Sequence, residues 1–150
     1  MIEKAQTNEN TLTHNKLMNK ILSGGCHCGA IRYIVTGEAI DSDYCHCHDC
    51  QKSVGAVAVT WCDFKSENCQ WLEGKVKEYQ SSDNIFRGFC ENCGTSLTYR
   101  HKDYPQFTTI ASATLDDPNR VAPKYHIHTA SQPDWLVIDD ALDKYPHARS

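Results

Sequence analysis

Seven of the nine cysteines in this chain of 150 residues are grouped in three short clusters. A tetrahedral zinc ion takes four ligands, and cysteine thiolates are among the ligands it prefers. The grouping therefore predicts one closed metal site with four sulfurs and a second site with only three. The clusters are Cys26-His-Cys28, Cys45-His-Cys47-His-Asp-Cys50 and Cys90-Glu-Asn-Cys93.

Composition narrows the class of protein. The number of cysteines is odd, and the N-terminal residues contain no apolar run that resembles a signal peptide. We therefore expect a cytoplasmic protein whose cysteines bind metal in a reduced state, with Cys62 and Cys69 as buried unliganded thiols. No segment approaches the ~20 apolar residues of a membrane span. The formal charge of −4 and the lack of a basic stripe also argue against nucleic acid as a partner.

The chain divides into an N-terminal arm and one domain. Residues 1–22 are rich in Asn, Thr and Lys, and we expect a flexible arm or a short docking helix there. Residues 23–150 form the predicted domain, in which short β-branched and aromatic runs alternate with turn residues. This pattern predicts a mainly antiparallel β fold of small coiled sheets. The expected strands are residues 31–36, 56–61, 69–72, 76–79, 85–89, 95–99 and 107–113.

Three local signals refine this outline. Glu73-Gly74 lies between two expected strands and predicts a tight hairpin. The run from Asp116 to Asn119 predicts a second turn. We place one short internal helix, with Asp49 as its N-cap and Gly55 as its stop.

The first and third clusters predict the closed site. Cys90 and Cys93 have the spacing of a zinc knuckle, and the glycines beside both clusters allow the backbone to approach a metal closely. We assign Cys26, Cys28, Cys90 and Cys93 to one structural zinc. This metal would tie together segments about 60 residues apart, which closes a long loop.

The middle cluster predicts the open site. Cys45, Cys47 and Cys50 lie within six residues and can occupy three corners of one tetrahedron. The fourth corner is left to water, a substrate or a more distant side chain. Cys50 also falls in the first turn of the expected helix, where backbone N–H groups favour a thiolate.

The identity of a fourth protein ligand is open at this point. His46 and His48 alternate with the cysteines, so in an extended segment they point to the opposite face and are poor ligands. His27, His126 or His128 can instead arrive from elsewhere and complete a structural site with three cysteines and one histidine.

Several ordered motifs, taken together, resemble one known family. The chain is similar to the glutathione-dependent formaldehyde-activating enzymes, also called Gfa-like or centromere protein V-like domains, from Gly24 to about Trp135. The motifs are GGCHCGAIRYIVTG, YCHCHDCQKSVGA, YQSSDNIFRGFCENCGTSL, ATLDDP and the Tyr125-His126-Ile127 run ahead of Trp135.

The resemblance implies a fold, two cofactors and an activity. The fold is Mss4-like, a complex of several small coiled antiparallel β-sheets stabilised by zinc. The two Zn²⁺ ions are divided as above, one structural and one catalytic at Cys45, Cys47 and Cys50. The activity is that of a carbon–sulfur lyase, S-(hydroxymethyl)glutathione synthase, which interconverts glutathione plus formaldehyde with S-hydroxymethylglutathione. A related thiol adduct is an alternative substrate, and a non-catalytic Mss4-like protein-binding module is the alternative function.

The expected substrate suggests three further site residues. Glutathione carries two carboxylates, and Lys52 and Arg87 lie close enough in sequence to the cysteine clusters to be candidates for binding them. His48 is a candidate for moving a proton at the developing hydroxymethyl oxygen.

Overall fold

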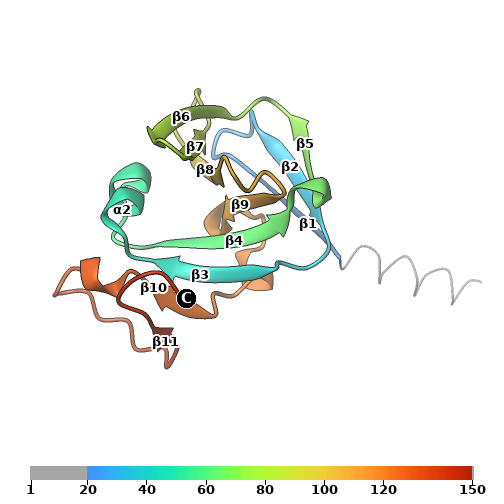
Figure 1. Cartoon of the computed structure of the whole chain (residues 1–150). Helices are drawn as coiled ribbons and strands as arrows, with labels where there is room; N and C mark the ends of the chain where they lie inside the picture. The colour runs from blue at the N-terminus through green and yellow to red at the C-terminus, as the bar shows by residue number, and fades with distance from the viewer. Residues whose placement is uncertain (1–19, 150) are drawn as a thin grey trace, which may run out of the picture.

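Two β-sheets make up most of the part of the chain that the computed structural model describes, residues 20–149 (Figure 1). The predicted arm, residues 1–22, therefore lies largely outside the described residues, although its last two residues, Ile21 and Leu22, belong to the first strand. The smaller sheet has the order β1-β2-β5 and is antiparallel throughout. Its strands are β1 (Ile21–Gly25), β2 (Arg32–Thr36) and β5 (Cys69–Glu73).

The larger sheet has eight strands in the order β11-β10-β3-β4-β9-β8-β7-β6. The short strand β10 pairs in parallel with both of its neighbours, and the other pairings are antiparallel. The prediction of a mainly β fold is confirmed. The strands are β3 (Asp41–Cys45), β4 (Val59–Lys65), β6 (Lys77–Ser82), β7 (Ile85–Phe89), β8 (Ser96–His101), β9 (Phe107–Ala111), β10 (Tyr125–Ile127) and β11 (Asp143–Lys144).

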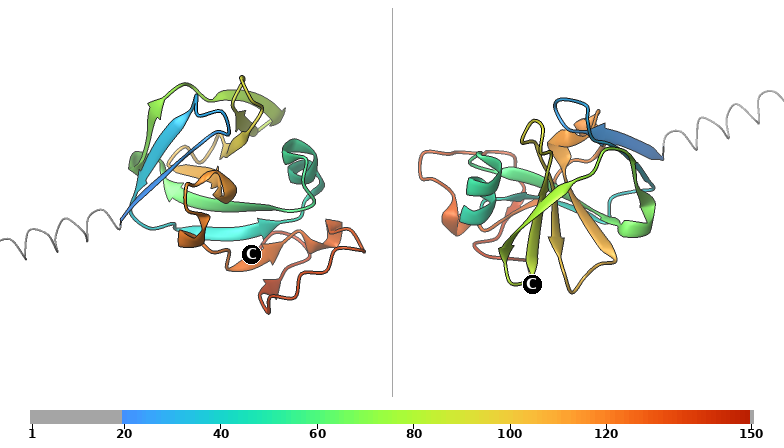
Figure 2. Two further views of the ribbon diagram at one scale, coloured as in Figure 1. Left: turned by 180° about the vertical axis from the view of Figure 1, so that it is seen from behind. Right: turned by 90° about the horizontal axis from the view of Figure 1, so that it is seen from above.

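Helical structure is short in the described residues. The α-helix α2 (His48–Val54) connects β3 to β4, and Figure 2 shows it standing at one end of these two strands. No helix in residues 20–149 has the length and apolar character needed to cross a membrane. Single turns of 3₁₀ helix are η1 (Ser66–Asn68), η2 (Ser112–Thr114), η3 (Pro118–Arg120) and η4 (Thr129–Ser131).

Strand β4 lies inside the larger sheet and is covered on both faces. Side chains alternate between the faces of a strand. Cys62 and Phe64 are fully buried in the main core, whereas Trp61 belongs to a second, smaller cluster on the other face. That smaller cluster contains Cys45 and Cys50, so one face of β4 packs the core and the other supports a cysteine cluster.

The predicted hairpin at Glu73-Gly74 is wrong. Gly74 has the positive φ of 68° expected for a turn, but the strands on either side of it, β5 and β6, belong to different sheets. A Cβ atom at this position would lie 2.2 Å from the carbonyl oxygen of Ala30. Gly74 therefore allows a close backbone approach where the chain passes from one sheet to the other.

The other turn prediction is confirmed. The Asp117 side chain accepts a hydrogen bond from the Asn119 backbone N–H at 3.2 Å and begins η3, which has Pro118 in its first turn. The sequence pattern also identified the strands of residues 31–36, 69–72, 76–79, 85–89, 95–99 and 107–113 to within a few residues. It placed β4 too early, at residues 56–61, and missed β1, β3, β10 and β11.

Candidate metal centres and the adjoining cavity

The four-cysteine cluster joins the two sheets. Cys26 directly follows β1 and Cys90 directly follows β7, and the sulfurs of these two residues and of Cys28 and Cys93 all lie within 4.8 Å of one another. Cys26 and Cys90 are buried, while Cys28 and Cys93 are exposed. The structure thus brings together the four side chains that the sequence pattern grouped.

The loops around this cluster direct hydrogen bonds at the sulfurs. The Ile31 backbone N–H donates to Cys26 Sγ at 3.2 Å. The Thr95 side chain lies 3.1 Å from Cys93 Sγ, and its hydrogen bond, with the backbone N–H of the same residue, lowers the pKa of Cys93 to about 5. Gly94 between them has a φ of 75°, which the turn requires. These contacts stabilise the thiolate that a metal needs.

The three-cysteine cluster is built where β3 passes into α2. Cys45 is the last residue of β3, Cys47 precedes the helix and Cys50 lies in its first turn, and their sulfurs also lie within 4.8 Å of one another. The predicted N-cap is wrong: Cys47 caps the helix, because its sulfur accepts the Cys50 backbone N–H at 3.2 Å, and Asp49 lies in the first turn. The predicted stop at Gly55 is confirmed by its left-handed conformation.

Arg87 is the positively charged side chain that contacts the three-cysteine cluster. Its guanidinium lies 3.5 Å from Cys50 Sγ and also donates to the Ser81 hydroxyl at 3.1 Å. Hydrogen bonds from the other two thiols, together with Arg87, hold the pKa of Cys50 well below its usual range. The same sulfur contacts raise the pKa of Cys45, with burial adding to the effect. The Arg87 guanidinium therefore favours the thiolate form of Cys50.

Both donor sets fit zinc. Sulfurs that lie ~2.3 Å from a tetrahedral zinc are ~3.8 Å apart. In the four-cysteine cluster Cys28 Sγ lies 3.5 Å from Cys26 Sγ and 3.8 Å from Cys90 Sγ. Thiolates favour zinc and other soft metals over magnesium or calcium. A metal ion would also replace the protons that the crowded thiols hold in its absence.

A cavity of about 460 Å³ opens beside the three-cysteine cluster. Cys45, Cys47 and Cys50 all contribute to its wall, so a small molecule in the cavity can reach the sulfurs. The other lining residues come from strands of the larger sheet, from α2 and from the C-terminal segment. These are Asp43, Asp49, Trp61, Asp63, Ser81, Ser82, Ile85, Arg87, Tyr99, Thr109, Ile127, His128 and Ala148.

No histidine in residues 20–149 has a ring nitrogen grouped with the three sulfurs. His128 lines the cavity outside that group, and His27 is exposed beside the other cluster. His126 is engaged elsewhere, and His46 is fully buried and faces away from the cysteines, as its alternation in sequence predicts. His48 is exposed on α2 and does not contribute to the cavity wall.

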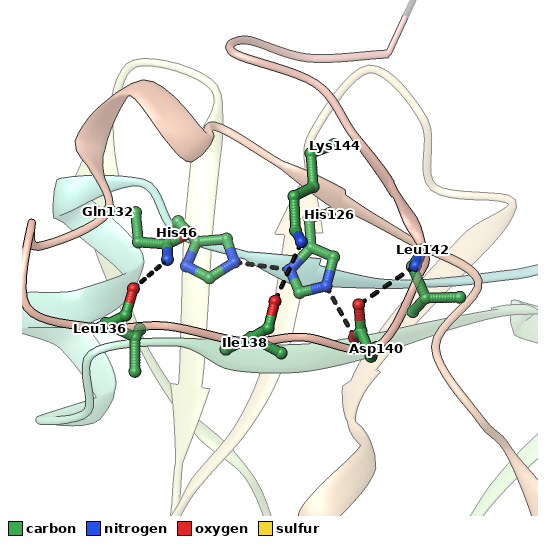
Figure 3. A network of polar contacts seen from close by, with 8 residues as sticks. All are labelled: His46, His126, Gln132, Leu136, Ile138, Asp140, Leu142 and Lys144. Carbon is green, nitrogen blue, oxygen red and sulfur yellow. Dashed lines mark hydrogen bonds and ion pairs between the residues drawn. The ribbon is translucent and has the colours of Figure 1, made fainter.

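His46 is part of a buried polar network on the opposite side of the cysteine loop (Figure 3). Its Nε2 lies 2.8 Å from His126 Nδ1, and His126 Nε2 lies 2.9 Å from a carboxylate oxygen of Asp140. Both rings are fully buried, and Tyr44 stacks on His126 with ring centroids 4.6 Å apart. Burial is the main cause that lowers the pKa of His46, with the neighbouring His126 adding to it.

The two predicted substrate cations lie in different surroundings. Lys52 is exposed on α2, whereas Arg87 is buried and engaged with Cys50. Both contribute to the wall of a smaller depression of about 290 Å³, which Arg87 separates from the cysteine cavity. Lys52 is thus the more solvent-exposed of the two cations.

Two acidic side chains in the cavity were not identified from the sequence. Burial, with the charges of neighbouring aspartates, raises the pKa of Asp43 to about 7. Burial likewise raises the pKa of Asp63, although the Thr109 hydroxyl donates a hydrogen bond to it. Asp43 and Cys45 share one face of β3, and Trp61 and Asp63 share one face of β4. The period-two alternation would have revealed these acids only once both strands were assigned.

We expect Asp63→Asn to stabilise the protein at neutral and alkaline pH. The folded protein binds the Asp63 proton more tightly than the unfolded chain does, so the contribution of this group is greatest below about pH 4 and is lost as the pH rises. The gain in the urea midpoint over the wild type should be present at pH 8 and vanish near pH 4. The exposed Asp139→Asn is the matched control. An equal gain at both pH values would contradict the assignment.

Comparison with known proteins covers most of the chain. A family model described as "Glutathione-dependent formaldehyde-activating enzyme" matches residues 21–131. A Halomonas elongata protein named "Putative glutathione-dependent formaldehyde-activating enzyme" is 26% identical, and the match covers 79% of this chain and 82% of that protein. A crystal structure of a Rhodobacter sphaeroides protein has a similar fold, with a TM-score of 0.55 at 20% identity. That match covers 82% of this chain and 98% of the other.

Proposed function

Because the chain belongs to the glutathione-dependent formaldehyde-activating enzyme family, we propose that it is a zinc-dependent carbon–sulfur lyase. Its reaction would interconvert glutathione plus formaldehyde with S-hydroxymethylglutathione or a closely related thiol adduct. The observation that carries this proposal is the three-sulfur cluster in the wall of an accessible cavity. Three protein ligands leave a tetrahedral zinc one position for a substrate thiol.

The two clusters would have different roles. Cys26, Cys28, Cys90 and Cys93 supply a full set of four ligands and would hold a structural zinc. The three-cysteine cluster would hold the catalytic zinc, which when bound supplies a means of lowering the pKa of a thiol at neutral pH. The free thiol state of all nine cysteines fits the reducing cytoplasm that we propose as its location.

The three thiolates would make the site negatively charged, and a side chain in the cavity wall would offset part of that charge. Arg87 lies against Cys50 and offsets part of the negative charge of three thiolates. The Ser81 hydroxyl accepts a hydrogen bond from Arg87 Nε and so fixes the guanidinium beside Cys50. With metal held by Cys45, Cys47 and Cys50, this thiolate-rich donor set would suit thiol chemistry.

The reaction itself forms one bond and moves one proton. The sulfur of the thiol attacks the carbonyl carbon of formaldehyde, a C–S bond forms, and the C=O π electrons move to the oxygen. The proton lost by the thiol is returned to that oxygen, which becomes the hydroxyl of the adduct. Because the cavity opens at the protein surface, solvent can deliver this proton. His48 lies outside the cavity wall, so we assign it no step.

Exchange NMR tests the lyase proposal directly. With formaldehyde and glutathione at equilibrium, the zinc-loaded protein should increase the exchange rate between free formaldehyde and its glutathione adduct above the uncatalysed rate. A rate equal to that of the buffer, measured on protein shown to contain two zinc ions, would contradict the enzyme and favour the binding-module alternative.

Lys52→Gln tests the proposed carboxylate contact. An exposed charge-assisted contact contributes about 1 kcal/mol, so the KM for glutathione should rise about fivefold with little change in kcat. Lys65→Gln is a matched control, because Lys65 is also exposed but lies at the far end of β4. Steady-state kinetics at low salt provides the measurement. An unchanged KM would remove Lys52 from the substrate site.

A further inference from the structure

The peptide between two predicted metal ligands is held by the C-terminal part of the chain and by α2. His46, which lies between Cys45 and Cys47, donates its backbone N–H to the Ile127 carbonyl at 3.1 Å. Its own carbonyl accepts from Gln51 Nε2 at 2.7 Å, and the same amide donates to the Ser131 carbonyl at 2.9 Å. The backbone on both sides of the His46 side chain is therefore fixed.

The His46 side chain adds a third attachment to the same part of the chain. Figure 3 shows the rings of His46 and His126 in a row, with the Asp140 carboxylate at the far end. The contacts of 2.8 Å and 2.9 Å join three residues from separate segments, and both rings are fully buried. Asp140 is itself held, because its other oxygen accepts the Leu142 backbone N–H at 3.1 Å.

The carboxylate sets the direction of the hydrogen bonds. A carboxylate only accepts, so His126 donates from Nε2 to Asp140. The other ring nitrogen of His126, Nδ1, faces His46 Nε2, and in a neutral His126 ring it accepts a hydrogen bond from that atom. The Nδ1 of His46 is buried without a hydrogen-bond partner in the described part of the chain. The ring orientation of His46 thus depends on His126 and Asp140, since no contact at its other nitrogen competes with them.

The three-cysteine cluster has particular need of such support. A four-sulfur site is closed by its own ligands, whereas a three-sulfur site has no fourth protein ligand to fix its geometry. We propose that Asp140, His126 and His46 form a positioning chain that holds the Cys45–Cys47 peptide in the geometry that binds metal. The three residues act through the loop and touch neither metal nor substrate. This inference rests on the metal-binding part of the proposed function.

Asp140→Asn is the most direct test, because it keeps the shape of the side chain and removes the charge that orients His126. Loss of an outer support of a metal site costs about tenfold or more in metal affinity. We therefore expect the weaker of two zinc equivalents to bind about tenfold less tightly in a chelator-competition titration, with the tighter equivalent unchanged. Cys47→Ser identifies which equivalent belongs to the three-cysteine cluster.

Two further variants and one spectrum separate positioning from general stability. His126→Phe keeps a ring stacked on Tyr44 but removes both hydrogen bonds, and it should weaken the same equivalent. Asp139→Asn, an exposed neighbour, should weaken neither. With cobalt(II) in place of zinc, Asp140→Asn should alter the visible d–d bands of the three-cysteine site alone.

The possible results are distinct. Unchanged binding in both Asp140→Asn and His126→Phe would overturn the positioning chain while leaving the lyase proposal intact. Weakening of both zinc equivalents together with a lower melting temperature would also overturn it, since the role would then be general stability. A wild-type protein that binds only one zinc would instead refute the second metal site, and with it both proposals.

Discussion

Cys90→Ser is expected to unfold most of the protein at room temperature. Cys90 is 1% exposed and belongs to the cluster that joins the two sheets. Structural zinc sites in small domains contribute about 10–16 kcal/mol of binding free energy, which is comparable to the ~5–15 kcal/mol stability of a whole domain. The loss of one of four ligands should therefore remove a large part of the folding free energy. Circular dichroism and zinc content measured on the same sample test this expectation.

Cys69→Ser is the matched control for that experiment. Cys69 is a half-buried cysteine that belongs to neither cluster, and its thiol donates to the Lys65 carbonyl at 3.6 Å. Its replacement should leave both zinc equivalents and lower the melting temperature by only a few degrees. If Cys90→Ser behaved in the same way, the structural assignment of the four-cysteine cluster would be wrong.

Cys47→Ser is expected to abolish activity while leaving the fold intact. Serine is among the best N-cap residues, so its hydroxyl can accept the Cys50 backbone N–H that the Cys47 sulfur accepts now. The substitution therefore preserves the start of α2 and removes a metal ligand. Outer supports of a metal site are worth about 10–100-fold, so loss of a direct ligand should lower kcat/KM by more than about 100-fold.

The measurement combines exchange NMR with metal analysis. The variant should bind one zinc, retain the wild-type circular dichroism spectrum and give the uncatalysed exchange rate. A variant that bound one zinc and kept full activity would show that the three-cysteine cluster is not the site of the reaction, even if the protein were a lyase.

The cysteine clusters were predictable because the residues of each cluster lie close together in the sequence. Cys90 and Cys93 lie close together in any turn of that spacing, and so do Cys45 and Cys47. The one long-range step, pairing the first cluster with the third, followed from the number of ligands that zinc takes. The folded chain brings those sulfurs within 4.8 Å of one another.

The surroundings of the clusters were not predictable, because they depend on strands with weak local signals. Residues 41–45 contain two aspartates and a serine, which are poor strand formers, yet they form β3 because β4 and β10 pair with them on both sides. The contact between His46 and His126 joins residues 80 positions apart. Arg87 reaches Cys50 across 37 positions. The spacing of residues along the chain does not predict such long-range contacts.

The failed hairpin has a similar cause. Glu73-Gly74 did predict a position with positive φ, because glycine tolerates that conformation locally. A turn sequence predicts that the chain changes direction. It does not predict which strands the two flanking strands pair with. Here β5 pairs with β2, and β6 pairs with β7. These pairings are determined by which apolar side chains each sheet buries.

The two covered faces of β4 have a consequence for mutational tolerance. Cys62 and Phe64 pack in the core, and the alternate residues Trp61 and Asp63 line the cavity. In a scan along this strand, substitutions at 62 and 64 should reduce the amount of folded protein, whereas replacement of Asp63 by another polar residue should change the cavity wall of protein that still folds. Within one strand of seven residues, positions that determine the amount of folded protein thus alternate with positions that line the cavity.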